Sequence, residues 1–214
     1  MTVSPVDFAS LLCSRLCHDL LSPVGALNNG LELLADETDP EMRQRVLDLL
    51  SESARASANK LKFFRLAFGA AGGFGEQVDS REAKIAIEGL LVDNKRTELG
   101  WFVEAATLPK PAIKVLLNLA MIASEALVRG GKLDIGGEDT GGQLEIVIKI
   151  EGPRIILDPE LRATLVDGEG ENGVTPRAAA AYLVHTLATG AGGAVQVNEP
   201  AENVMVFGAV FNAR

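Results

Sequence analysis

The feature that most restricts the fold is a series of apolar residues, spaced three and four apart, near the start of the chain. This spacing places side chains on one side of an α-helix, which has about 3.6 residues per turn. The apolar stripe consists of Phe8, Leu12, Leu16, Leu20, Val24, Leu27, Leu31 and Leu34. We therefore predict one long helix from about Pro5 to Ala35.

A second long helix is predicted after the segment DETDP, which interrupts the first pattern. Asp39 is suited to cap it and Pro40 to occupy its first turn, and it should extend to about Phe68. Its apolar side carries Met42, Val46, Leu49, Leu50, Ala54, Leu61 and Phe64. A helical hairpin cannot bury a full stripe by itself, so we expect two copies to form a four-helix bundle as a homodimer. The alternative is that the hairpin folds onto the C-terminal half of its own chain.

His18 lies opposite to the apolar stripe of the first helix, so it should point away from the core. Asp19 follows it directly. Pro23 lacks an N–H and its ring crowds the helix, which predicts a kink one turn further on. The small residues on the same side as the histidine are Ser14, Ser22 and Gly25. We predict that this side is a docking face for another protein.

An exposed histidine has three interpretations, of which the simplest is a solvated surface residue. A metal ligand is disfavoured because His185 is the only other histidine and no carboxylate cluster accompanies His18. The third interpretation is a nucleophile. Imidazole titrates near pH ~6.5, so much of it is neutral at cellular pH, and the adjacent carboxylate of Asp19 could orient the ring.

Composition narrows the class of protein. The chain has 214 residues, 47% of them apolar, which is enough for a packed core. The net charge of −9 argues against general binding to nucleic acid or anionic lipid. The sequence has neither an apolar run of bilayer length nor the features of a signal peptide, so we expect a cytoplasmic protein. Cys13 and Cys17 are expected to be reduced core residues rather than zinc ligands.

The second half of the chain predicts an α/β sandwich. A glycine-rich stretch at 69–77 is interpreted as a linker between domains at 1–70 and 76–214. Beyond it, predicted helices alternate with strands of a mostly antiparallel sheet, and one helix is expected at about 175–189. We interpret His185 as structural and the acidic run at 167–173 as a loop rather than a calcium site.

The motif HDLLSP resembles the box around the phosphorylated histidine in two-component histidine kinases, where His is followed by Glu or Asp and then, at the fifth position, by Pro. The longer stretch LCHDLLSPVGALNNGLELL is more similar to the histidine phosphotransferases of alphaproteobacterial phosphorelays. The similarity extends over most of the chain. It implies an α+β protein, with a homodimeric helical hairpin followed by a domain like the ATP-binding domain of histidine kinases.

The boxes that bind nucleotide in histidine kinases are altered here. VLLNLAMIASEALVRGG resembles the kinase box with a magnesium-binding Asn, but Ile122 stands at that position. Ile150 stands where the adenine-binding Asp is expected, and Arg154 replaces a glycine of the same box. The glycines of the last box are replaced by Pro176, Ala178 and Ala180. Isoleucine can neither ligate magnesium nor accept a hydrogen bond from adenine, so we predict that the fold is kept and ATP is not bound.

Together these features predict a phosphorelay histidine phosphotransferase with His18 as nucleophile and Asp19 as the residue that orients it. The docking surface is expected to consist of Ser14, Arg15, Leu21, Ser22, Gly25 and Asn29. The resemblance implies no cofactor in this chain, since a receiver domain of a response regulator would supply magnesium. It also implies three receiver-containing partners: a hybrid kinase upstream, and a cell-cycle transcription factor and a proteolysis adaptor downstream. The alternatives are an ATP-dependent histidine kinase and a receiver-binding scaffold or phosphatase that carries no phosphate.

Overall fold

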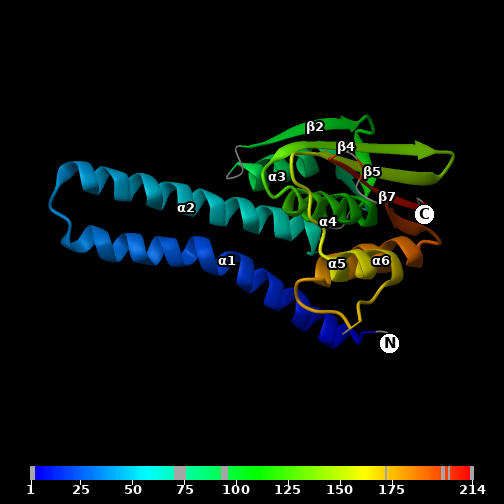
Figure 1. The fold of residues 1–214 in the computed structure, drawn as a ribbon, viewed down its shortest axis with the longest axis horizontal. Coiled ribbons are helices and arrows are strands. Elements are labelled where there is room, and N and C mark those ends of the chain that lie inside the picture. Colours follow the sequence, from blue (N-terminus) through cyan, green and yellow to red (C-terminus); the bar gives the residue numbers. More distant parts are fainter. Residues whose placement is uncertain are drawn as a thin grey trace.

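The computed structural model describes residues 3–69, 76–92, 96–171, 173–198, 201 and 203–212. Two long antiparallel helices extend from a sheet domain, and the N-terminal end of the first helix lies beside helices of that domain (Figure 1). None of the described helices combines the length and the apolar character that are needed to cross a bilayer.

The hairpin consists of α1 (Pro5–Asp36) and α2 (Pro40–Ala67), as the apolar periodicity predicts. Local capping determines where both helices begin. The side chains of Ser4 and Asp39 each accept a hydrogen bond from a backbone N–H of the first turn, and a proline follows each cap. The predicted cap at Asp39 is therefore confirmed.

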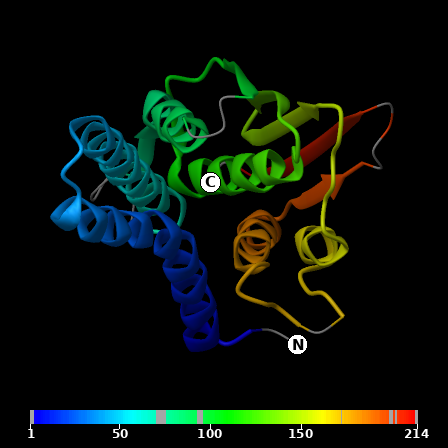
Figure 2. The same ribbon diagram turned by 60° about the vertical axis from the view of Figure 1, so that its left-hand side comes forward.

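Helix α1 changes direction part-way along its length (Figure 2). Pro23 is the proline inside this helix, and it accounts for an interrupted hydrogen-bond ladder. The first turns of α1 approach the C-terminal domain, where the ring of Phe8 packs edge-on against Tyr182 with centroids 5.1 Å apart. The hairpin thus contacts the rest of its own chain as well as presenting a free end.

The remaining elements alternate between short helices and strands. They are β1 (Gln77–Asp79), α3 (Ser80–Leu91), β2 (Thr97–Val103), β3 (Thr107–Pro109), α4 (Lys110–Ala126), β4 (Gly131–Thr140), β5 (Gln143–Glu151), α5 (Pro159–Asp167), α6 (Ala179–Gly190), β6 (Ala194–Val197) and β7 (Val204–Asn212).

The main sheet has five strands in the order β2-β4-β5-β7-β6. Strand β2 runs parallel to β4, and the other neighbours are antiparallel. Strands β4 and β5 are joined at Gly141 and Gly142, with φ of 68° and 89°. Glycine adopts these angles without strain, and the two-residue turn matches the twist of a hairpin. The predicted mostly antiparallel sheet is confirmed.

One face of the sheet carries the core. Residues of β5 and β7 alternate between buried and more exposed, and the buried ones join the strongly apolar α4 in a single cluster. The last turns of α2 contribute Phe63, Phe64, Leu66 and Ala67 to the same cluster. The hairpin is therefore anchored in the core of the sheet domain. Most of the predicted linker at 69–77 lies outside the described residues, so the domain boundary stays a prediction.

Several local expectations need correction. Cys13 and Cys17 are exposed rather than packed in the core, because α1 leaves that side uncovered in a single copy of the chain. The helix expected at 175–189 begins at Ala179, after a turn that contains Pro176. Helix α5 and the short strands β1 and β3 were not predicted, since segments of nine and three residues carry little periodic signal.

Candidate functional site

His18 is on the outer side of α1, and its side chain is 85% exposed. This placement follows from the helical periodicity, because the residues that face the C-terminal domain or α2 are on the other sides of the helix. The imidazole is thus open to a macromolecule that approaches α1 from outside.

Asp19 lies directly beside the imidazole. The distance between Nδ1 of His18 and Oδ1 of Asp19 is 3.2 Å, and the carboxylate side chain is only 17% exposed. An ionised carboxylate can only accept hydrogen bonds, so a hydrogen bond between these two atoms requires the proton on Nδ1. In the neutral ring this leaves a lone pair on Nε2. An imidazole nitrogen with a free lone pair can act as a nucleophile.

Arg15 occupies a different environment from the one expected. It was predicted to form part of the docking surface, but it is buried and its side chain points into contacts within the chain. Its Nε donates to Oδ2 of Asp19 over 2.6 Å, Nη2 pairs with the carboxylate of Glu125, and Nη1 donates to the backbone carbonyl of Arg177 over 3.3 Å. Arg15 therefore connects α1 to the C-terminal domain.

The negative charges of Glu125 and Asp19 stabilise the buried guanidinium of Arg15. Burial by itself would lower the pKa of the Arg15 guanidinium, but the carboxylates of Glu125 and Asp19 together outweigh burial, and the pKa is raised above its ordinary value. Arg15 is thus a permanent cation between two carboxylates. A buried charge needs such partners, because an unpaired one is costly in a medium of low dielectric constant.

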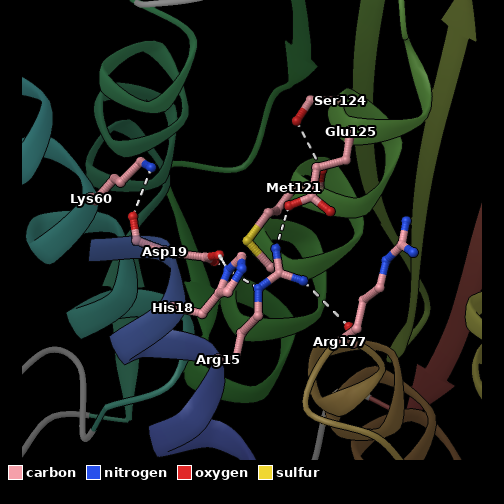
Figure 3. Close-up of polar contacts among 8 residues, drawn as sticks. All are labelled: Arg15, His18, Asp19, Lys60, Met121, Ser124, Glu125 and Arg177. Atoms are coloured by element: carbon pink, nitrogen blue, oxygen red, sulfur yellow. Dashed lines mark hydrogen bonds and ion pairs between the residues drawn. The ribbon is translucent and has the colours of Figure 1, made fainter. Parts of the chain in front are cut away.

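The backbone next to His18 has a second anchor. Pro23 has no N–H to offer the carbonyl of Asp19, which is four residues earlier. Nζ of Lys60, on α2, donates to this carbonyl over 2.9 Å (Figure 3). The kink therefore exposes an acceptor, and the neighbouring helix satisfies it.

A pocket of about 650 Å³ lies beside the histidine. Its walls come from α1, from α4 and from the turn that precedes α6. The lining residues are Ser14, Arg15, His18, Asp19, Glu125, Thr175, Pro176 and Arg177. The other residues predicted for the docking face, Leu21, Ser22 and Asn29, are exposed further along α1, and Gly25 is half-buried there.

Sequence reasoning missed Lys60, Glu125, Thr175, Pro176 and Arg177 as neighbours of His18. The ion pair between Arg15 and Asp19 could have been predicted from the sequence, because the two residues are four apart on a helix, which is a standard spacing for an ion pair. The others join residues that are far apart in the chain, such as Lys60 with Asp19 and Glu125 with Arg15. No local pattern marks these pairs.

Two of the residues predicted to stand in place of kinase nucleotide ligands, Ile122 and Ile150, are core side chains. Ile122 on α4 is 2% exposed and Ile150 on β5 is fully buried, and both belong to the main hydrophobic cluster. Within the described ranges, no group of three or more His, Cys, Asp or Glu side chains could hold a metal ion. His185 has a structural contact, since its Nδ1 lies 3.2 Å from the carbonyl of Leu165.

Comparison with known proteins identifies the family of this chain. The family described as histidine phosphotransferase C-terminal domain matches residues 80–203. Protein phosphotransferase ChpT of Brucella abortus (strain 2308) is 36% identical over 206 residues, which cover 96% of each chain. A solved structure of a bacterial phosphotransferase superposes with a TM-score of 0.85 at 34% identity, covering 98% of each chain. The chain therefore belongs to the histidine phosphotransferase family that includes ChpT.

Proposed function

We propose that the protein is a phosphorelay histidine phosphotransferase that carries a phosphoryl group between receiver domains of response regulators. Nε2 of His18 attacks the phosphorus of an aspartyl phosphate on one receiver. The bond from phosphorus to the aspartate oxygen breaks, a bond from phosphorus to Nε2 forms, and the donor carboxylate leaves with the electron pair. A second receiver aspartate then takes the phosphoryl group in the same way.

The contact between His18 and Asp19 carries the proposal. When Nε2 forms a bond to phosphorus, positive charge develops on the ring, and the proton stays on Nδ1. A carboxylate 3.2 Å from Nδ1 stabilises that charge and keeps the ring in one orientation. The exposure of the imidazole leaves room for the active site of a docked receiver.

The receiver supplies magnesium and a lysine in this proposal, so the chain needs no cofactor of its own. The protein does not use ATP either. Support comes from Ile122 and Ile150, which pack in the core at the positions where a kinase would bind magnesium and adenine. Closely packed apolar side chains offer neither a ligand for magnesium nor an acceptor for an adenine amine.

The active form in this proposal is a homodimer. Part of the predicted stripe remains uncovered in a single copy, since Val24 and Leu31 on α1 and Met42, Leu49 and Leu61 on α2 are all exposed. Exposed apolar patches are typical of protein interfaces. A second hairpin packed against it would complete a four-helix bundle and leave both copies of His18 on the outside.

The C-terminal domain is proposed to be a second contact surface for the receiver. The pocket beside His18 has one wall on α1 and another formed by Glu125 and the turn of Thr175, Pro176 and Arg177. A receiver that brings its aspartate to His18 therefore meets both walls. The donor and the acceptor of the phosphoryl group are both receiver domains in this proposal, and we also place the protein in the cytoplasm. Which response regulators bind stays a prediction from the resemblance.

The test is phosphoryl transfer to the full-length chain. A receiver domain labelled with ³²P on its aspartate is mixed with the protein, and label on the protein is followed in acid and in alkali, since phosphohistidine is labile to acid. We expect acid-labile label on the wild type, none on His18→Ala, and passage of the label to a second receiver.

Other outcomes separate the alternative functions. Loss of label from the receiver as free phosphate, without labelling of this chain, would identify a phosphatase. Binding of the receiver without either event would identify a scaffold. Labelling of the chain by ATP alone would identify a kinase, and each of these three results would overturn the proposed function.

A further inference from the structure

We propose that Arg15 is a positioning residue, which is held by Glu125 of the C-terminal domain and orients Asp19 so that His18 presents Nε2. The inference rests on the proposed function for the identity of the reaction. It assigns to the sheet domain, whose nucleotide boxes are altered, a direct part in setting the geometry of the nucleophile.

The two oxygens of Asp19 have separate partners. Oδ2 accepts from Nε of Arg15 over 2.6 Å, and Oδ1 lies 3.2 Å from Nδ1 of His18. A carboxylate with one oxygen engaged by a fixed cation loses the freedom to rotate, so the other oxygen stays directed at the ring. An exposed imidazole with no such partner would sample several orientations and both neutral forms.

Arg15 can perform this role because it is itself held in place. Its side chain is only 10% exposed, and its three donor groups contact Asp19, Glu125 and the backbone carbonyl of Arg177. Two of these three contacts come from the C-terminal domain. Movement of that domain relative to α1 would therefore disturb the carboxylate next to the nucleophile, and not only the docking surface.

Glu125 is the residue that distinguishes this role from simple packing. Its side chain is 43% exposed and lies on α4. Among the described residues its carboxylate pairs with Arg15, and no hydrogen bond or ion pair joins it to His18 or Asp19. Replacing it with Gln keeps the size of the side chain and removes the charge that holds Arg15. The hydrogen bonds that link this change to the ring of His18 run through Arg15 and Asp19.

The experiment uses the full-length chain with ¹⁵N-labelled histidine. NMR shifts of the two ring nitrogens of His18 report which one carries the proton, and a single-turnover assay at saturating phosphorylated receiver reports the transfer rate. The variants are Arg15→Gln, Arg15→Lys, Glu125→Gln and Asp19→Asn. Arg81→Gln is the matched control, because it removes a surface ion pair with Asp79 that is outside the pocket.

We expect the proton on Nδ1 in the wild type and in Arg81→Gln, and a shift of the proton towards Nε2 in Arg15→Gln. Transfer should slow on the order of 10²-fold in Arg15→Gln, as expected for a misplaced reacting group. Glu125→Gln should show a smaller change of the same kind, and Arg15→Lys should restore part of the rate. In the Asp19→Asn background, Arg15→Gln should have no further effect.

An unchanged proton position and rate in both Arg15→Gln and Glu125→Gln would overturn the inference. If Arg15→Gln does not fold, the result for Glu125→Gln alone tests the inference. This variant should fold, because the side chain of Glu125 is partly in solvent. If the wild type accepts no phosphate, the proposed function fails, and the NMR measurement still decides whether Arg15 and Glu125 orient the imidazole.

Discussion

The ammonium group of Lys60 donates a hydrogen bond to the backbone carbonyl of Asp19 over 2.9 Å. This carbonyl is the one that Pro23 leaves without its helical donor. Because Asp19 follows His18 directly, the bond fixes the turn of α1 that carries His18 to α2. The turn is then held on two sides, by Lys60 through the backbone and by Arg15 through the carboxylate.

Lys60→Met should lower the free energy of unfolding by roughly 1 to 3 kcal/mol, because a carbonyl inside the hairpin loses its partner. Pro23→Ala restores an N–H that can donate to the carbonyl of Asp19. In that background, Lys60→Met should therefore lower the free energy of unfolding by less. Chemical denaturation of the four proteins in this cycle gives the coupling. Lys62→Met, at an exposed position on the same helix, is the control and should change stability by less than about 0.5 kcal/mol. If Lys60→Met lowered the free energy of unfolding equally with and without Pro23, the bond from Lys60 would not replace the missing helical hydrogen bond.

Asp19→Asn should slow phosphoryl transfer by a factor within the range of general acid–base contributions, roughly 10² to 10⁴ at most. The neutral amide keeps the shape of the carboxylate but does not stabilise the charge on the ring. Single-turnover rates measure the effect. Asp48→Asn on α2, which is outside the pocket, should leave the rate as it is. A normal rate in Asp19→Asn would leave Asp19 with a structural role only.

If the proposed homodimer forms through the apolar stripe, Leu31→Asp should convert it to a monomer. Leu31 belongs to the predicted stripe, and burying a leucine side chain contributes about 1.5 to 3 kcal/mol. Leu33 is a matched control, because it is 60% exposed where Leu31 is 59% exposed, and it lies about 200° away around the helix. Sedimentation velocity distinguishes the two variants. Loss of the dimer with Leu33→Asp and not with Leu31→Asp would place the interface on the other side.

Arg177→Ala should weaken binding of the receiver about tenfold, which corresponds to about 1.4 kcal/mol, with little change of the transfer rate at saturation. The backbone carbonyl that accepts from Arg15 is kept in this variant. Asp158→Asn removes the same ion pair from the other side and leaves the arginine in place, so it should retain affinity. Titration calorimetry with a receiver domain measures both. An unchanged affinity of Arg177→Ala would argue against a contact at this turn.

Mg-ATP should not raise the melting temperature, even at about 100 times the dissociation constant of a typical kinase. An occupied site would add about 2.7 kcal/mol under that condition. Ile122→Asn should not restore binding, because Ile150 still fills the position of the adenine acceptor in the core. Differential scanning fluorimetry with and without Mg-ATP tests both proteins. A shift for the wild type would show that the alignment of the nucleotide boxes is wrong.

The sequence by itself determined the hairpin and the outward position of His18. Capping residues and prolines act on their own first turns, so Ser4 and Asp39 place the beginnings of α1 and α2 without reference to the rest of the fold. Periodicity is equally local. It assigns a side of the helix to each residue, and the side assigned to His18 is the exposed one.

Only the tertiary structure decided which residues surround the histidine. Arg15 was predicted to be part of the docking surface, but the C-terminal domain covers it, and its second carboxylate partner is Glu125 on α4. Lys60 and Arg177 likewise reach the site from other parts of the chain. Such contacts depend on how elements pack rather than on spacing within one element. The physical reason is that the position of a residue in a helix determines the direction of its side chain, whereas its contacts depend on which other elements pack against that side of the helix.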